Sequence, residues 1–140
     1  MEYVGSFLFF GFFGWIFENA FSGKYMCNPL VEHIFPYICI IPILILYAIG
    51  GVLVMWAYKN IPDLWTRVVF YFIAFNLLEL IGGVVGKYFI CPYINTCKEK
   101  TMMWDYSSSS YDLWGYIDIK HALIWPILGL GAELLVSKIY

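Results

Sequence analysis

Long apolar runs make up most of this chain, and their length limits what it can fold into. Four stretches, residues 3–22, 34–58, 64–90 and 117–139, consist mainly of apolar residues. A helix needs about 20 such residues to cross a bilayer, because each residue adds about 1.5 Å along the helix axis. We therefore predict an all-α, polytopic membrane protein: a four-transmembrane-helix bundle with one long connecting loop, forming a single domain over residues 1–140.

The composition favours the same class. Of the 140 residues, 62% are hydrophobic and only 13% are charged, whereas soluble domains carry about 25% charged residues and about 45–50% apolar ones. The net charge of −2 leaves no basic surface for a nucleic acid. The expected surroundings are the lipid bilayer, with a second copy of the chain or other subunits of a membrane complex as further partners.

The connections between the predicted helices differ in length. Residues 59–63 form a tight turn, whereas residues 91–115 form a long loop that contains four consecutive serines, 107 to 110. We expect the serine run to be a solvated loop tip. Four spans place both chain ends on one side, which we call the terminal face. The long loop and residues 23–32 then share the opposite side, which we call the loop face.

Ionisable side chains interrupt the apolar runs. Glu79 lies near the middle of the third run, and Glu18 lies in the last turn of the first. A carboxylate inside a membrane span is costly, so it normally faces protein and marks a functional site. Asn76 shares a helical stripe with Glu79, and Asp118 shares one with His121, which indicates that these residues face the bundle interior.

Such inward-facing side chains are expected to meet in one pocket, reached from the loop face. The primary candidates for this pocket are Glu18, Asn76, Glu79, Asp105 and His121. The secondary candidates are His33, Trp104, Tyr106 and Asp118. We expect the two aromatic residues to be interfacial anchors, because amphipathic rings collect at headgroup depth, and we expect Asp105 to tie the long loop to the bundle.

Two further charged residues lie toward the terminal face. Arg67 lies near the start of the third run and Glu133 lies near the end of the fourth. We predict a buried ion pair between them with a structural role. Loss of either partner would be costly, because it leaves the other charge buried without compensation.

We expect no resident metal or cofactor. His33 and His121 could hold a metal or a haem between two helices, and this is the alternative, although no Glu-x-x-His pair lies within one helix. Cys27, Cys91 and Cys97 lie in connections and fit neither zinc nor redox spacing. Free thiols are expected, and a disulfide among the three stays open if their side of the membrane is oxidising.

Several short motifs resemble those of a known family. They are Trp104-Asp105-Tyr106-Ser107, Gly115-Tyr116-Ile117 followed by a Trp-Pro pair, Gly14-Trp15-Ile16-Phe17-Glu18, and Leu78-Glu79. With them the chain resembles the transmembrane protein 229 family, which includes bacterial CmpB-like proteins labelled as ABC transporter permeases. The resemblance implies a small polytopic membrane protein and marks Glu18, Glu79, Trp104, Asp105, Tyr106 and Gly115. An ABC permease would need a separate ATPase, because the chain has no nucleotide-hydrolysing motif.

Three functions fit these residues. The first is a membrane protein whose carboxylate and histidine pocket, open to one face, handles a lipid headgroup, a small polar solute or a proton. The second is a structural or accessory subunit of a larger assembly, such as a transporter, in which the polar groups serve only packing. The third is a membrane-embedded enzyme that modifies a lipid. The sequence favours a protein that is not an enzyme, because no nucleophile lies beside a base at a suitable spacing.

Overall fold

The computed structural model describes residues 2–22, 36–90, 92 and 106–139, without the side chains of residues 18–22, 36–43 and 139. Within this part, the chain forms α1 (Glu2–Ser22), α2 (Pro36–Asn60), α3 (Leu64–Val85), the π-helical extension η1 (Gly86–Ile90) and α5 (Ile119–Ile139). The helices therefore lie in the four apolar stretches of the sequence.

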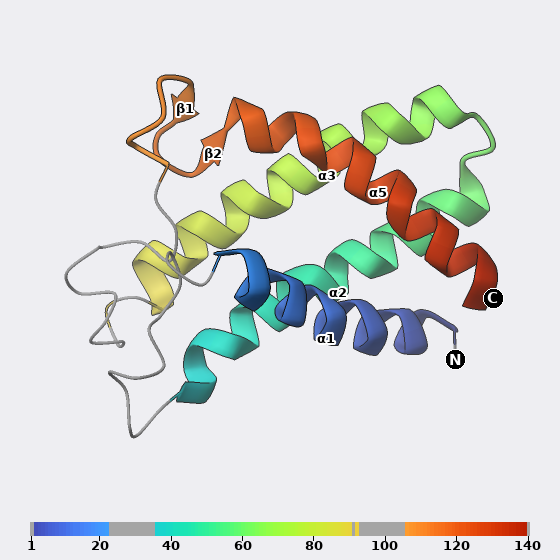
Figure 1. Cartoon of the computed structure of the whole chain (residues 1–140), viewed down its shortest axis with the longest axis horizontal. Helices are drawn as coiled ribbons and strands as arrows, with labels where there is room; N and C mark the ends of the chain where they lie inside the picture. Colours follow the sequence, from blue (N-terminus) through green and yellow to red (C-terminus); the bar gives the residue numbers. More distant parts are fainter. Residues whose placement is uncertain (1, 23–35, 91, 93–105, 140) are drawn as a thin grey trace.

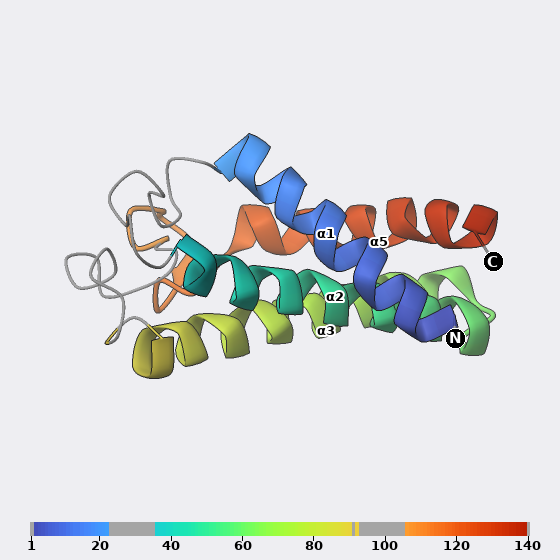
Figure 2. The same cartoon turned by 90° about the horizontal axis from the view of Figure 1, so that it is seen from below.

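The helices are arranged as two pairs, α1 with α2 and α3 with α5, and α2 also connects the two pairs. α1 packs mainly along α2, and α3 packs along α5, while α2 also contacts both α3 and α5. Figure 1 shows both chain ends on one side of the assembly and the two short strands on the opposite side. Figure 2 shows that α1 runs obliquely across the other helices.

A small hairpin precedes α5, where the sequence predicted only a loop and the start of a helix. The strands β1 (Asp112–Leu113) and β2 (Ile117–Asp118) pair in antiparallel fashion. Trp114 and Gly115 at the turn have positive φ angles of 54° and 75°, as in the type I′ turns that join hairpin strands. The structure is thus mainly helical, as predicted, and the hairpin moves the start of the last helix from the predicted residue 117 to residue 119.

Small residues allow α1 and α2 to approach closely. A Cβ atom on Gly14 would lie 2.1 Å from the ring of Tyr47, and one on Gly51 would lie 2.4 Å from Phe10. The Ser6 hydroxyl donates a buried hydrogen bond to the carbonyl of Gly51 at 3.0 Å. Glycine and serine at a helix crossing are typical of membrane helices, where backbones gain contact by close approach.

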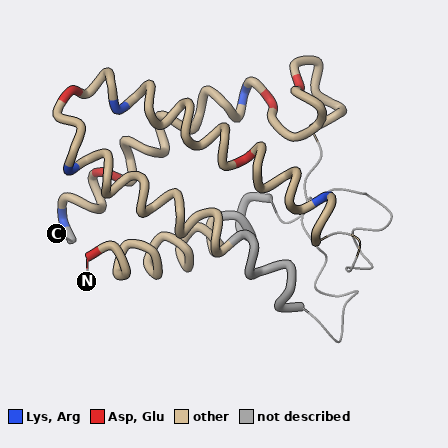
Figure 3. Tube along the Cα trace, turned by 180° about the vertical axis from the view of Figure 1, so that it is seen from behind, with Lys and Arg blue, Asp and Glu red and all other residues tan. Residues whose placement is uncertain are grey.

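The outer surface along the helices is apolar. Trp65, Phe89, Ile127 and Leu134 are among many large hydrophobic side chains that are exposed. In Figure 3 the charged residues gather mainly toward the two ends of the assembly. An apolar exterior of this kind suits contact with hydrocarbon and not with water.

Charged and polar side chains close the helix ends on the terminal face. Lys59 of α2 forms an ion pair with Glu2 of α1. Asp63 caps α3: its carboxylate accepts hydrogen bonds from the backbone N–H and the hydroxyl of Thr66, both at 2.7 Å. The cap provides an acceptor for an N–H group that has no partner within the helix. The tight turn predicted at residues 59–63 is thus closed by local bonds.

Candidate functional site

A cavity of about 790 Å³ lies inside the helical assembly. Its wall is built by α1, α2, α3 and α5, and by Tyr106 from the loop before β1. α1 packs mainly along α2 and crosses the bundle obliquely (Figure 2), and residues of both α1 and α5 line the cavity. The volume falls within the range of about 300–1,000 Å³ that is typical of small-molecule sites.

Part of the cavity wall also belongs to the outer surface. Phe13 and Ile16 of α1, and Ile127 and Leu135 of α5, line the cavity, and each of these side chains is exposed. Gly131 lies on the same stretch of α5, and nothing lies within 4 Å of the position that its Cβ would take. Exposed side chains of α1 and α5 thus form part of the cavity wall. That the pocket is reached from the loop face stays a prediction, because several residues of that face lie outside the described part of the chain.

A buried carboxyl group lies in the cavity wall. Glu79 of α3 is 8% exposed, and both oxygens of its carboxyl group accept a hydrogen bond. The Tyr106 hydroxyl donates to Oε1 at 3.0 Å, and the indole Nε1–H of Trp125 in α5 donates to Oε2, also at 3.0 Å. These donors, one from α5 and one from the loop before β1, hold the carboxyl group in a defined orientation.

The cavity wall is mostly apolar. Its polar side chains are those of Tyr47, Glu79, Tyr106 and Trp125, and apolar residues such as Leu46 and Leu78 lie beside them in the sequence. Among the described residues that line the cavity, Glu79 is the acidic one, and none is a lysine, arginine or histidine.

Several contacts hold the loop that carries Tyr106 against the start of α5. The ring of Tyr106 stacks on that of His121, with 4.7 Å between the ring centroids. His121 Nδ1 lies 3.1 Å from a carboxylate oxygen of Asp118. The backbone N–H of Tyr106 donates to the carbonyl of Gly115 at 3.0 Å. His121 and the hairpin therefore determine where the hydroxyl that contacts Glu79 is placed.

Ser109 takes part in this arrangement, although the sequence predicted its serine run to be a solvated loop tip. Its hydroxyl donates a hydrogen bond to the buried carboxylate of Asp118. This bond holds the pKa of the Asp118 carboxyl below its usual range, and the contact with His121 acts in the same direction. The negative charge of Asp118 is thus stabilised at the loop face.

Comparison with known proteins identifies the family of the chain. Residues 5–140 match the CmpB family described as "Putative ABC-transporter type IV". The protein belongs to this family. The CmpB-like part of the resemblance is therefore confirmed, while the transmembrane protein 229 part stays a prediction. No curated protein and no solved structure matches the chain.

The family and the helices together indicate an ABC-transporter-related membrane protein with partners in a membrane complex. In the described part of this family member, the continuous helices Leu64–Ile90 and Ile119–Lys138 are long and apolar enough to cross a membrane. Only 22% of the most apolar window of each helix is buried. A core helix of a soluble protein would instead be buried on most sides.

Three residues that the resemblance marks are linked in the structure of this CmpB family member. Glu79 is bonded to the side chain of Tyr106, and the backbone of Tyr106 is bonded to Gly115. Gly115 has a φ of 75°, which side chains other than glycine rarely adopt. The three residues therefore connect the cavity to the hairpin turn.

The other predicted pocket residues have different positions. His121 does not line the cavity and reaches Glu79 only through Tyr106, and its side chain is 52% exposed. Asp118 contacts His121, which in turn stacks on Tyr106, and it does not line the cavity. Glu18 is in α1, but its side chain is not described. Three predicted residues lie outside the described residues: His33, Trp104 and Asp105.

Asn76 lies at the contact between α3 and α5 and does not line the cavity. Its Nδ2 donates to the carbonyl of Phe72 at 2.6 Å and to that of Ala122 in α5 at 3.5 Å. Pro126 follows Ala122 by four residues and has no N–H, so the Ala122 carbonyl lacks its usual helical donor. Asn76 supplies a donor at this point, as neighbouring helices do for prolines in membrane helices.

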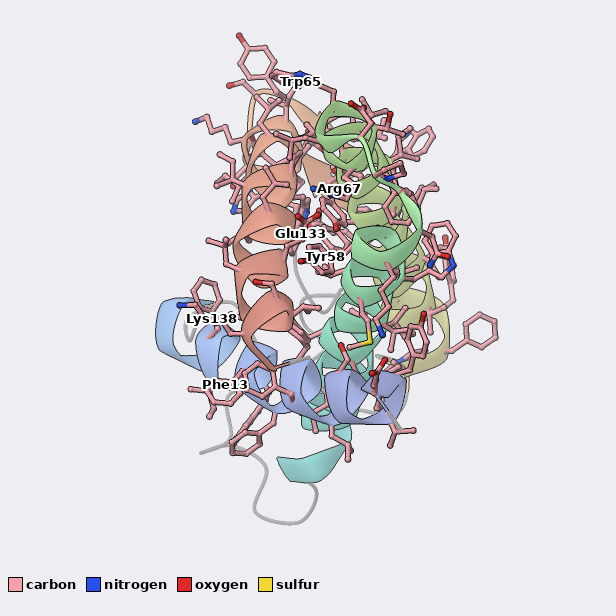
Figure 4. All side chains as sticks on the ribbon, turned by 90° about the vertical axis from the view of Figure 1, so that its right-hand side faces the viewer. Phe13, Tyr58, Trp65, Arg67, Glu133 and Lys138 are labelled. Carbon is pink, nitrogen blue, oxygen red and sulfur yellow. The ribbon has the colours of Figure 1, made fainter. Side chains whose placement is uncertain are left out.

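Arg67 and Glu133 lie together near the terminal face, as the sequence predicted. Arg67 Nε donates to Glu133 Oε1 at 2.7 Å, and the Tyr71 hydroxyl donates to the same oxygen at 2.6 Å. Arg67 Nη1 also donates to the carbonyls of Ile61 and Pro62 at 2.7 and 3.1 Å. Figure 4 shows Arg67 and Glu133 pointing toward one another. The guanidinium thus joins α3, α5 and the turn before α3.

Two residues that donate hydrogen bonds to the buried carboxyl groups, Trp125 to Glu79 and Tyr71 to Glu133, were not among the predicted site residues. Trp125 follows His121 by one helical turn, and Tyr71 follows Arg67 by one turn. Residues four apart share a helix face, so this spacing was a usable signal. The sequence could not indicate that these side chains would reach carboxylates on another helix.

The predictions about metals, haem and disulfides are not tested by the described residues. No group of three His, Cys, Asp or Glu side chains in this part of the chain is arranged to hold a metal ion. His33 and the cysteines 27, 91 and 97 lie outside it. A metal or haem site at His33 and His121 therefore stays an alternative, and so does a disulfide.

Proposed function

We propose that this protein is a membrane-embedded binding component of an ABC-transporter-related assembly, and that its cavity holds an apolar or amphipathic ligand taken from the bilayer. In this proposal α1, α2, α3 with η1, and α5 all cross the membrane as a four-helix bundle and a single domain. The family match, the apolar exterior and the two helices long enough to span a bilayer support it.

The composition of the cavity wall carries the proposal. Most of its side chains are apolar, and the few polar ones include Glu79 with its two donors Tyr106 and Trp125. A small polar solute would leave hydrogen-bonding groups unpaired against such a wall, which is costly. Of the ligands considered from the sequence, a lipid therefore fits better than a polar solute or a proton alone.

The exposed rim between α1 and α5 supports entry from the side. Phe13 and Ile127 face both the cavity and the apolar exterior. A hydrocarbon chain can pass between such residues without contacting water. Entry from the loop face would instead lead past Tyr106, whose hydroxyl is bonded to Glu79.

Filling the cavity tests this function. Gly131→Phe directs a ring into open space, because nothing lies within 4 Å of its Cβ position. We expect photolabelling of the purified protein in nanodiscs by a phosphatidylcholine with a photoreactive chain to fall about tenfold, equivalent to about 1.4 kcal/mol of binding energy. The matched control is Leu134→Phe, an outward-facing position on the same helix that does not line the cavity. Equal labelling of both variants would refute the proposed ligand site.

The membrane arrangement has its own test. With four spans, a cysteine at Ser108 and one at Lys138, each in a background without the native cysteines, should react with an impermeant thiol reagent from opposite sides of a vesicle. The two positions lie near opposite ends of the assembly. Labelling of both from the same side would rule out four crossings.

A role as a structural or accessory subunit is the second candidate. Two sets of contacts favour it. Asn76 donates a hydrogen bond to the Ala122 carbonyl, and Arg67 donates to Glu133 and to the carbonyl of Ile61 in the turn before α3. These polar groups act in packing and do not line the cavity. In that case Glu79→Gln would lower the amount of folded protein, while neither it nor Gly131→Phe would change lipid labelling.

A further inference from the structure

The hairpin formed by β1 and β2 presents large side chains at its tip. We propose that this tip, from Tyr111 to Trp114, lies in the lipid headgroup layer on the loop face and binds that layer through its aromatic rings. The inference goes beyond the proposed function. It rests on the proposed crossing of the membrane by α5, and it does not involve the cavity or its ligand.

Trp114 combines exposure with an unfavourable backbone conformation. Its side chain is 73% exposed, and that of Tyr111 is 68% exposed. The φ angle of Trp114 is 54°, which costs free energy in a residue that has a Cβ atom, and asparagine, aspartate or glycine normally takes this turn position. Such a conformation persists only where the surrounding structure imposes it, and it is concentrated at functional positions. Local folding therefore does not explain a tryptophan here.

The hairpin is held by several bonds, so the fold itself directs its tip outward. The Asp112 carboxylate accepts a hydrogen bond from the backbone N–H of Gly115 at 2.6 Å. The backbone N–H of Ile119 donates to the carbonyl of Tyr111 at 3.3 Å. The first bond closes the turn that contains Trp114, and the second ties the hairpin to the start of α5.

The length of α5 determines the level of the hairpin in the membrane. The apolar helix Ile119–Lys138 has 20 residues, which corresponds to about 30 Å along the axis, the thickness of the hydrocarbon core. When α5 crosses the bilayer, Ile119 lies at the boundary of the hydrocarbon, and the hairpin directly before it lies among the headgroups. Tryptophan and tyrosine side chains concentrate at this depth, because their rings are apolar and their N–H or O–H groups reach polar partners.

The apolar surface of α5 continues to the hairpin. Ile119, Leu123 and Ile127 are exposed and follow one another at intervals of four residues, so they lie on one face of the helix. Leu113 of β1 is exposed as well. A surface that is continuous with the lipid-facing side of a membrane helix is covered by the same bilayer.

The charges near the tip suit a lipid surface. Lys120 is exposed at the start of α5, and the Lys87 ammonium at the end of α3 lies 5.7 Å from the ring centre of Tyr116. The hairpin carboxylates are used internally, since Asp112 binds the turn and Asp118 accepts from Ser109. Lysines at the membrane surface are attracted to anionic headgroups. The partner that fits an aromatic tip flanked by cations at this depth is the headgroup layer.

Fluorescence quenching tests the depth of Trp114. Its emission is obtained as the difference between the unmodified protein and Trp114→Phe, both in nanodiscs of phosphatidylcholine and phosphatidylglycerol. We expect lipids brominated near the headgroup end of their chains to reduce this difference emission more than lipids brominated at the chain end. Acrylamide, a quencher dissolved in the water, should reduce it less than it reduces the emission of free tryptophan.

Photolabelling provides a second measurement. A phosphatidylcholine with a diazirine in its headgroup should label the peptide that contains residues 111–119, and Trp114→Asn should reduce this labelling about threefold. Asparagine suits the turn, so the hairpin still forms in this variant. Trp65→Asn is the matched control, because Trp65 is exposed to the same degree, 74%, but lies at the start of α3 on the terminal face. Its replacement should leave the labelling of the hairpin unchanged.

Four outcomes would overturn the inference. Quenching by acrylamide as strong as for free tryptophan would place the tip in water, and stronger quenching by the chain-end bromine would place it in the hydrocarbon. If neither quencher reaches Trp114, protein covers the tip, either another part of this chain or a second copy. Equal labelling of the unmodified protein and Trp114→Asn would show that the ring does not hold the tip in the headgroup layer.

These failures are distinguishable from a failure of the proposed function. The cavity test with Gly131→Phe does not depend on the hairpin, so the ligand site would stand in each of the four cases. Labelling of the cysteines at Ser108 and Lys138 from the same side of a vesicle would instead show that α5 does not cross the membrane, and would remove the basis of this inference as well.

Discussion

Two buried carboxylates of this protein have contrasting surroundings. Glu133 lies beside the packed core formed by α2, α3 and α5, where it accepts hydrogen bonds from the guanidinium of Arg67 and the hydroxyl of Tyr71. Glu79 lies in the wall of a cavity, where an indole and a phenol donate to it. The first carboxylate is neutralised by a cation within a filled interior, and the second borders open space.

The contrast separates a structural use of buried charge from a use in binding. A charge that is paired in a packed core has no room for a ligand, and its removal is costly because the partner charge remains. A carboxyl group that is oriented by uncharged donors beside a cavity can accept a hydrogen bond from a ligand. Ionisable residues within membrane helices mark function by default, and here packing distinguishes the two cases.

The largest expected effect comes from breaking the filled site. Arg67→Met removes the ion pair and the donors to the Ile61 and Pro62 carbonyls. We expect the free energy of unfolding, measured in mixed detergent micelles, to fall by about 3–5 kcal/mol, because Glu133 is left buried without compensation. Adding Glu133→Gln should recover part of this loss. A loss below about 1 kcal/mol, the value of an exposed pair, would contradict the structural role of the Arg67–Glu133 pair.

Two glycines of α5, Gly129 and Gly131, allow the packed core and the cavity to be compared by the same substitution. A Cβ on Gly129 would lie 2.6 Å from the ring of Tyr71, whereas one on Gly131 would meet nothing within 4 Å. We expect Gly129→Ala to reduce the free energy of unfolding by about 1–3 kcal/mol through overpacking. Gly131→Ala should leave it unchanged or raise it by up to about 1 kcal/mol, the helix propensity gain. Similar losses in both variants would mean that the cavity closes in solution.

A smaller loss is expected at Glu79. Glu79→Gln keeps the shape and can keep both contacts, because its amide oxygen accepts from the Trp125 indole and its amide N–H donates to the Tyr106 hydroxyl. The free energy of unfolding should therefore fall by no more than about 1 kcal/mol. Trp125→Phe, which removes the indole donor and keeps a ring, is the matched control. The two losses should not simply add in the double variant, because residues in direct contact are coupled. A loss as large as that of Arg67→Met would assign Glu79 to the structural class.

The smallest effect concerns the hairpin that positions Tyr106. The pKa of Asp118 is held low by the Ser109 hydroxyl in the folded state. A carboxyl whose pKa is lowered by folding stabilises the fold fully above its unfolded value of about 3.9, and this contribution disappears as the pH falls through the lower folded value. The midpoint of thermal unfolding should therefore drop on acidification below about pH 4. Asp118→Asn should have a lower midpoint at neutral pH and a weaker drop, and an unchanged profile would contradict this.

Much of the secondary structure could be predicted because it depends on local properties of the sequence. The length of an apolar run is set by bilayer thickness, so the four helices were expected where they occur. The hairpin was missed, because its strands have two residues each and its turn includes Trp114, a non-glycine residue with positive φ. Neither feature has a strong signature in the sequence.

The sites were predictable in part. Helical periodicity and depth were enough to bring Arg67 and Glu133 to the same end. They were also enough to place Asn76 on an inward face, but not to assign it to Ala122, because that contact depends on how α5 packs around Pro126. Tyr106 was a secondary candidate for the same pocket as Glu79, but its direct bond to Glu79 and that of Trp125 could not be foreseen, since the two residues lie 27 and 46 positions away along the chain.

The sequence alone determined that this is an apolar, helical chain whose acidic residues must turn inward, because hydrocarbon does not solvate charge. Only the tertiary structure decided that one acid meets an arginine in a filled core and the other borders a cavity. That difference depends on the angle at which α1 crosses the bundle and on the glycines where it contacts α2. Crossing angle and side-chain packing arise from contacts between distant segments, so no local pattern in the sequence records them.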